Sequence, residues 1–144
     1  MDKTALIVGV GGLGCPAAVG LAEGGVQRLV LVDPDQVTLS NLQRQVLYGT
    51  PDLGRPKAAV AAERLRARFP GVDITARVER VTPASLPALL DLARGADVVL
   101  DCTDDPAARF WVNDAALARG VPSVIAGLLR YEGLVVAVPA DHGP

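Results

Sequence analysis

The chain has 144 residues, which is enough for one domain with its own hydrophobic core. Its formal net charge is −2, so the chain has no general attraction for nucleic acid or for an anionic membrane surface, and an anionic ligand would need a local cluster of donors. Its two cysteines, Cys15 and Cys102, form neither a CxxC motif nor a disulfide framework, which favours a reducing, cytoplasmic location.

The first predicted unit includes a long uncharged stretch. Residues 5–22 carry no charge, and a stretch of this length would qualify as a membrane span or a signal segment. Gly9, Gly11, Gly12, Gly14 and Pro16 lie within it, and they would disrupt a continuous helix. The same residues suit a strand, a tight turn and a new helix, so we predict soluble core here and no membrane association.

Short apolar runs then alternate with helical patterns along the chain. The predicted strands are residues 5–8, 29–32, 72–78, 98–100 and 121–125, and the predicted helices are residues 13–22, 56–69, 83–93 and 106–119. Most strands are continuously apolar, which is typical of parallel strands covered on both faces. We predict one domain over residues 1–144 with a Rossmann-like, doubly wound α/β fold: a mostly parallel sheet with helices on both faces. Residues 134–138 add an antiparallel edge strand, and residues 140–144 form a loop.

A glycine-rich turn follows the first predicted strand. Gly9, Gly11 and Gly14 satisfy the GxGxxG pattern between a strand and a helix, where backbone N–H groups can face a phosphate. Asp33 lies nineteen residues after Gly14, at the end of the second strand, where a carboxylate can accept hydrogen bonds from ribose hydroxyls. The alternative to a nucleotide site is a purely structural role, in which the glycines form a tight turn and Asp33 ends the strand. Alone, this pair favours an NAD-dependent enzyme.

The next segment argues for a different nucleotide. More than twenty residues, 34–55, precede the next helix, and long irregular segments in compact domains are usually functional. They contain Asn41 and Arg44, and Lys57 follows in the first turn of the helix. A cation at the start of a helix is unfavourable by ~0.3 to 1 kcal/mol, because it repels the positive end of the helix dipole. A lysine at this position therefore indicates a nearby anion such as a polyphosphate. A solvated lysine on an exposed helix end is the alternative.

An acidic cluster follows the fourth predicted strand, at the sheet edge where ligands of such folds bind. Asp105 precedes Pro106 and is expected to cap the following helix. Asp104 is therefore the better candidate for binding Mg²⁺, which usually takes one or two protein carboxylates together with phosphate oxygens and water. Arg109 and Asn113, one and two turns into this helix, face either the same cleft or solvent.

These motifs together resemble a known family. The strings GVGGLG, DPDQVTLSNLQRQ, LGRPK and DCTDD, followed by Arg109 and Asn113, are similar to the adenylation domain of ubiquitin-activating-type enzymes. The similarity is strongest to the bacterial ThiF/MoeB/HesA type, which activates sulfur-carrier proteins for molybdopterin or thiamine synthesis. It extends from residue 4 to about residue 138, and SNLQRQ is far more specific than the glycine turn.

The resemblance implies a reaction and a site. The family uses ATP and Mg²⁺ to adenylate the C-terminal glycine carboxylate of a small ubiquitin-like protein, with release of pyrophosphate, and its members pair as homodimers. Its residues imply the following roles here: Gly11 and Gly12 lie against the nucleotide, Asp33 holds the ribose, Asn41, Arg44 and Lys57 bind phosphates, and Asp104 binds Mg²⁺. Arg44, Lys57 and Asp104 would be the catalytic residues. Fixed cations and a metal neutralise charge without proton transfer, so no general base is required.

The chain departs from the family pattern in three places. Asp105 stands where the family usually has Asn. The expected domain lacks the preceding helical segment from which a partner subunit supplies an arginine, and also the zinc-binding CxxC pairs that follow in the family. Neither Cys15 nor Cys102 matches the family's sulfur-carrying cysteine, and we expect both to fill the core. Two other hypotheses stay open: a non-catalytic module that binds nucleotide or a ubiquitin-like tail, and an NAD-dependent oxidoreductase.

Overall fold

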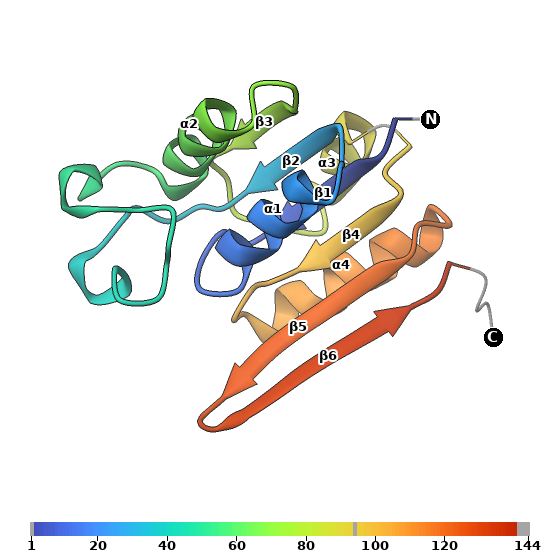
Figure 1. Cartoon of the computed structure of the whole chain (residues 1–144). Helices are drawn as coiled ribbons and strands as arrows, with labels where there is room; N and C mark the ends of the chain where they lie inside the picture. Colours follow the sequence, from blue (N-terminus) through green and yellow to red (C-terminus); the bar gives the residue numbers. More distant parts are fainter. Residues whose placement is uncertain (1, 94, 141–144) are drawn as a thin grey trace.

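A twisted sheet forms the centre of the computed structural model, which describes residues 2–93 and 95–140. Within these residues the sheet has six strands in the order β3-β2-β1-β4-β5-β6 (Figure 1). The elements in chain order are β1 (Thr4–Val8), α1 (Gly14–Glu23), β2 (Arg28–Val32), α2 (Lys57–Arg68), β3 (Asp73–Arg77), α3 (Leu86–Leu92), β4 (Val98–Asp101), α4 (Pro106–Ala118), β5 (Ser123–Leu129) and β6 (Glu132–Val138).

The strand pairing confirms the predicted fold class. β1 pairs in parallel with both β2 and β4, while β3 and β5 extend the parallel sheet on either side. β6 alone runs antiparallel, with its residues from Glu132 to Val138 paired to those of β5. The strand order reverses direction between β1 and β4, and ligands of open α/β sheets bind at such a switch point.

Alternating side chains of each central strand enter two separate cores. In β1, Ala5 and Ile7 pack with α1 and α2 on one face, whereas Leu6 and Val8 pack with α3 and α4 on the other. All four side chains are buried. The continuous apolar runs of the sequence therefore follow from a strand covered on both faces. Figure 1 shows the two helix layers on opposite sides of the sheet.

The residues that were predicted to begin helices α2 and α4 stand at the starts of those helices in the structure. Asp105 caps α4, since its Oδ1 accepts a hydrogen bond from the Ala107 N–H at 3.0 Å. Lys57 is the first residue of α2, and the buried face of that helix includes Ala58 and Leu65. None of the helices in the described part of the chain is both long and apolar enough to cross a membrane.

Two predicted boundaries were wrong by several residues. The helix expected from residue 83 begins at Leu86, because Thr82 and Ser85 exchange side-chain to backbone hydrogen bonds of 2.9 and 3.1 Å that form a turn before it. The strand expected to end at residue 125 continues to Leu129, because its pairing with β6 extends that far. Of the loop predicted at residues 140–144, only Ala140 lies within the described residues.

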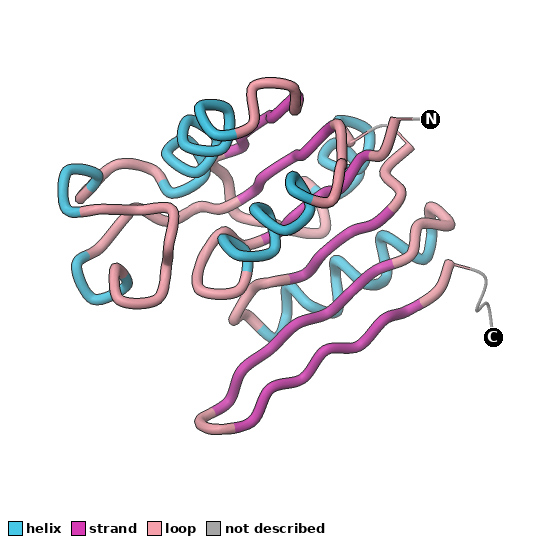
Figure 2. The backbone as a smooth tube through the Cα atoms, viewed as in Figure 1, coloured by secondary structure: helices cyan, strands magenta, loops and turns pink. Residues whose placement is uncertain are grey.

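The segment between β2 and α2 is irregular, as predicted. It contains only two short 3-10 turns, Leu39–Asn41 and Thr50–Asp52. Figure 2 shows this long loop beyond the ends of β1 and β2, the side of the sheet on which the parallel strands finish. The fold therefore brings the loop, the glycine-rich turn and the residues that follow β3 and β4 to one edge of the sheet.

Candidate functional site

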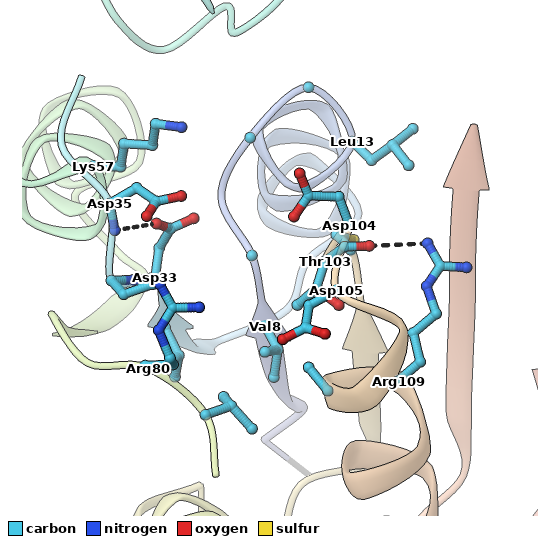
Figure 3. Close-up of a pocket in the computed structure, with 18 of the residues that line it drawn as sticks. Val8, Leu13, Asp33, Asp35, Lys57, Arg80, Thr103, Asp104, Asp105 and Arg109 are labelled. Atoms are coloured by element: carbon cyan, nitrogen blue, oxygen red, sulfur yellow. Dashed lines mark hydrogen bonds between the residues drawn. The ribbon is translucent and has the colours of Figure 1, made fainter. Parts of the chain in front are cut away.

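A cavity of about 440 Å³ lies at the carboxyl ends of the parallel strands. Its floor is the end of β1 and the glycine turn, and its walls are the residues that follow β2, β3 and β4 together with α2, α4 and β5. Figure 3 shows Lys57, Asp33 and Arg80 on one side of this cavity and Thr103, Asp104, Asp105 and Arg109 on the other. The cavity has the size and the position of a small-molecule site in this fold class.

The glycine turn is shaped by two close backbone approaches. Gly9 has φ +90°, and a Cβ there would lie 2.8 Å from the Cys102 carbonyl oxygen. A Cβ on Gly14 would lie only 1.9 Å from the Gly9 carbonyl oxygen, so this position accepts no side chain. Within the described residues, the backbone N–H groups of Gly11, Gly12 and Leu13 have no acceptor. Free N–H groups before the ten-residue helix α1 can donate hydrogen bonds to an anion such as a phosphate.

Asp33 is a buried carboxylate held in a fixed orientation. It is 5% exposed, and its two oxygens accept hydrogen bonds from the N–H groups of Val10 at 2.8 Å and Asp35 at 2.7 Å. Burial raises the pKa of Asp33, while these two hydrogen bonds and the charge of Lys57 act in the opposite direction. Each oxygen can accept one further hydrogen bond, so the carboxylate can bind neighbouring hydroxyls of a sugar.

Lys57 supplies a cation to the cavity wall. The residue is 6% exposed and lines the cavity. Its ammonium group makes no ion pair and no hydrogen bond with any other described residue. Most of the side chain is buried, whereas the charge of the ammonium acts on the cavity and on the neighbouring carboxylate of Asp33. A cation at this point suits an anionic ligand, as the helix-dipole argument also predicted.

The loop before α2 carries Arg44 over the glycine turn. The Cδ of Arg44 lies 3.4 Å from the place that a Cβ on Gly12 would occupy, and Arg44 lines the cavity. Asn41 does not line the cavity; its side-chain oxygen instead accepts a hydrogen bond from Thr38 Oγ1 at 2.7 Å. The phosphate role that the sequence suggested for Asn41 therefore remains a prediction.

Hydrogen bonds of two side chains hold this loop against the rest of the domain. Tyr48, which is buried, donates a 2.6 Å hydrogen bond to the Val10 carbonyl in the glycine turn. Asp52, also buried, accepts hydrogen bonds from Gly49 N–H at 2.9 Å, from Arg64 at 2.8 Å and from Arg55 at 3.1 Å. These bonds, the Gly49 N–H first, hold the pKa of Asp52 below its usual range. The loop is thus a fixed wall of the cavity.

The opposite wall is built by the residues after β4. Asp101 is fully buried, and its Oδ1 accepts hydrogen bonds from the backbone N–H and the hydroxyl of Thr103 at 2.9 and 2.7 Å. Arg109 donates to the carbonyls of Thr103 at 2.9 Å and Ala126 at 3.0 Å, which ties this wall to β5. Asp104, between these fixed points, is exposed and lines the cavity. Asn113, in contrast, contacts Ser123 through a long 3.5 Å bond away from the cavity.

The carboxylates fit Mg²⁺ better than a metal that needs a full protein cage. No group of three or more His, Cys, Asp or Glu side chains that could hold a metal ion occurs within residues 2–93 and 95–140. Asp104 and the nearby Asp105 are the oxygen donors at this wall, and Asp105 is partly engaged as the helix cap. One or two carboxylates are what Mg²⁺ takes when phosphate oxygens complete its shell.

Neither cysteine is an activated thiol. Cys15 is fully buried and donates to the Val10 carbonyl at 3.4 Å, and burial raises its pKa. Burial likewise raises the pKa of Cys102 to about 11. A reactive cysteine needs a lowered pKa, which neither residue has. The predicted core-filling role fits Cys15, whereas Cys102 is only partly buried and lines the cavity.

Most of the predicted site residues meet in this cavity. Gly11, Gly12, Asp33, Arg44, Lys57 and Asp104 all line it. The cavity also includes residues that the sequence motifs did not assign to it: Asp35, Gln45, the residues 79–81 after β3, and Gly127 and Leu128 of β5. Gln45 lies inside the SNLQRQ string, which was the available signal for it. The segments after β3 and within β5 carry no local motif, and only the topology brings them here.

A comparison with models of protein families identifies the family of this chain. The model of the ThiF family matches residues 2–144 of the chain. The chain belongs to the ThiF family. The resemblance carried by the glycine turn, the SNLQRQ string and the acidic cluster is thereby confirmed.

Individual members of the ThiF family are similar over nearly the whole chain. The sulfur carrier protein ThiS adenylyltransferase of Escherichia coli is 45% identical and covers 99% of the chain, which spans 57% of that protein. The adenylyltransferase and sulfurtransferase MOCS3 of Sus scrofa is 47% identical and covers 96% of the chain, which spans 30% of that protein. The chain thus corresponds to less than two thirds of either relative.

Solved structures show the same fold. E. coli MccB, crystallised with MccA-N7isoASN, superposes on 94% of the chain with a TM-score of 0.84 and 26% identity, and the chain covers 39% of it. E. coli tRNA N6-threonylcarbamoyladenosine dehydratase, TcdA, superposes on 90% of the chain with a TM-score of 0.81 and 28% identity, and the chain covers 55% of it. The fold of this chain is therefore shared with solved structures that carry different names.

Proposed function

We propose that residues 1–144 are the ATP-binding adenylation domain of a ThiF-family enzyme. In this proposal the enzyme transfers AMP from ATP to the C-terminal carboxylate of a small ubiquitin-like sulfur-carrier protein. The curated relatives support the reaction class, because two of them are named adenylyltransferases and one is named for the carrier ThiS. The resemblance also implies a homodimer, in which a partner's arginine reaches the phosphates.

The polarity of the cavity supports one orientation of ATP. Arg44 lies beside Gly12 of the glycine turn, and Lys57 lies on the same side of the cavity, at the start of α2. Val32 and Val81 line the cavity and belong to the core on the side of α3 and α4. The phosphates then lie at the cationic end and the base at the apolar end, with the ribose between them at Asp33.

This orientation suits adenylation. A carboxylate oxygen of the carrier attacks the α-phosphorus, a new P–O bond forms, the bond to the bridging oxygen breaks, and pyrophosphate leaves with the electron pair. The two reactants are anions, so their repulsion dominates the barrier, and fixed cations stabilise the charge as it moves to the leaving group. Lys57 and Arg44 would hold the phosphates in place. No proton is transferred, so no general base is needed.

Asp104 would hold Mg²⁺ in this site. It stands opposite Lys57 across the cavity (Figure 3), and the bonds that fix Thr103 also fix the backbone beside it. Bound Mg²⁺ would act as a Lewis acid on phosphate oxygens. The role of Asp104 is to place the metal on the side of the phosphates that the cationic wall does not reach.

Lys57 is the observation that carries the proposal. A dinucleotide-binding turn with a ribose-binding aspartate serves NAD as well as ATP. The pyrophosphate of NAD carries fewer charges than a triphosphate, and it needs no additional ammonium from the next helix. A cation of this kind beside an arginine fits a more highly charged polyphosphate.

The test is exchange of labelled pyrophosphate into ATP in the presence of a carrier protein with a C-terminal glycine. We expect exchange with the wild-type chain and its loss in Lys57→Ala and in Asp104→Ala. Two exposed residues outside the cavity provide matched controls, Lys3→Ala and Asp114→Ala, which keep the activity. ATP binding without exchange would favour a binding module. Preferential binding of NAD would refute the proposal in favour of an oxidoreductase.

A further inference from the structure

The carbonyl of Val10, in the glycine turn, is held by side chains from two other parts of the chain. Tyr48 Oη donates a hydrogen bond to it at 2.6 Å, and Cys15 Sγ, a weaker donor, lies 3.4 Å from it. On the other side of the residue, the Val10 N–H donates to Asp33 at 2.8 Å. Both peptide planes that meet at Val10 are therefore fixed before any ligand enters the cavity.

The carbonyl of Val10 and the N–H of Gly11 belong to the same peptide plane. In a trans peptide these two groups point in opposite directions. Tyr48 is buried and does not line the cavity, so the bond to it draws the Val10 carbonyl into the protein. The Gly11 N–H, which has no acceptor among the described residues, is thereby turned toward the cavity that Gly11 lines.

The glycine at position 11 makes the orientation of this peptide plane reversible. The plane rotates when ψ of Val10 and φ of Gly11 change together, and a glycine accepts φ of either sign. Without the Tyr48 hydroxyl, the Val10 carbonyl would keep only the long thiol contact, and a buried carbonyl without a good partner costs stability. Rotation of the plane would relieve this cost by turning the oxygen toward the cavity, and it would turn the Gly11 N–H away.

We propose that Tyr48 is a positioning residue, whose hydroxyl holds the Val10–Gly11 peptide with its N–H toward the phosphates of the nucleotide. This inference rests on the proposed function, because those phosphates belong to ATP. Tyr48 does not touch the nucleotide and acts through the Val10 carbonyl. A phosphate that meets the Gly11 N–H, rather than the carbonyl oxygen of a rotated peptide, binds about tenfold more tightly or better.

The replacement Tyr48→Phe removes the hydroxyl and keeps the ring in the core. We expect it to raise the Kd for MgATP about tenfold and to leave the Kd for adenosine, which has no phosphate, unchanged. The Tm falls, because a buried hydrogen bond is lost. Arg66→Met is the matched control, since Arg66 also donates to a backbone carbonyl, that of Ile74, and does not line the cavity. It lowers the Tm without changing either Kd.

NMR of the chain labelled with 15N-glycine reads the orientation of the peptide directly, with inorganic pyrophosphate as the probe. We expect pyrophosphate to shift the Gly11 amide resonance of the wild-type chain and not that of Tyr48→Phe at the same concentration. Gly20, within α1 and outside the cavity, is the internal reference. An equal shift of the Gly11 resonance in both proteins would overturn the inference.

The outcomes separate this inference from the proposed function. If Tyr48→Phe binds MgATP as tightly as the wild-type chain does, the inference is wrong and the proposed function stands. A parallel loss of adenosine and MgATP binding in Tyr48→Phe shows a general loosening of the site and also refutes the inference. A wild-type chain that binds no MgATP refutes the proposed function, and the pyrophosphate shift of Gly11 then decides the orientation of the peptide by itself.

Discussion

The replacement Lys57→Met is the sharpest perturbation of the phosphate end of the cavity. Methionine keeps an unbranched apolar stem of similar length but removes the charge. Lys57 is 6% exposed as a residue and lines the cavity, so a phosphate that enters the cavity can approach its ammonium. Binding of the phosphate then gains the Coulomb attraction between the two charges.

The size of the effect follows from the separation of the two charges and from the dielectric constant of the site. Two unit charges about 4 Å apart attract each other by about 4 kcal/mol at an effective dielectric constant of about 20. Each ~1.4 kcal/mol changes a dissociation constant tenfold, so the attraction corresponds to about a thousandfold in affinity. Arg44 remains in the variant and compensates in part, and we expect the Kd for MgATP to rise about a hundredfold.

Isothermal titration calorimetry at two salt concentrations checks this magnitude and its cause. A buried charge is poorly screened, so the wild-type to Lys57→Met ratio of Kd values should change little when salt is raised. Lys3→Met is the control, since Lys3 is 65% exposed in its side chain and pairs with Asp97 at 3.8 Å. A rise of less than about threefold for Lys57→Met, or an equal rise for Lys3→Met, would refute the reasoning.

Three further predictions concern the framework of the site. Asp52→Asn lowers the Tm at neutral pH, because the pKa of Asp52 is lowered in the folded protein and its charged form stabilises the fold. This stabilisation is present above about pH 4 and is lost as the pH falls through the folded-state pKa. The Tm values of the wild-type and Asp52→Asn proteins therefore converge in acid. Gly14→Ala prevents native folding by circular dichroism, because its Cβ would lie 1.9 Å from a carbonyl oxygen, whereas Gly20→Ala in the same helix has open space and raises the Tm. Cys15, which is fully buried and whose pKa is raised by burial, reacts with a thiol reagent at pH 7 only after unfolding. Rapid labelling of Cys15 in the native protein would contradict this.

The fold was largely predictable, because each central strand is covered on both faces and reads as a continuous apolar run. The ends of the elements were less predictable where tertiary pairing decided them. The length of β5 depends on its antiparallel partner β6, and apolar residues such as Val135 are exposed there, so the two-core pattern does not extend to this edge.

The site was predictable where local motifs mark it. The glycine turn, Asp33 and Lys57 stand at positions that backbone geometry and helix-dipole arguments single out. The buried state of Gln45 could not be read from the sequence, since neighbouring residues in the same string, such as Gln43, are exposed. Arg80 and Leu128 reach the cavity only because parallel strands end at one edge of the sheet.

The central claim is that this site joins AMP to a carrier carboxylate. The most direct measurement is mass spectrometry of a ubiquitin-like carrier with a C-terminal glycine after incubation with the chain, MgATP and pyrophosphatase. The account predicts a carrier heavier by one AMP group, formed with the wild-type chain and absent with Lys57→Met. A carrier of unchanged mass, under conditions in which the wild-type chain binds both MgATP and the carrier, would contradict it.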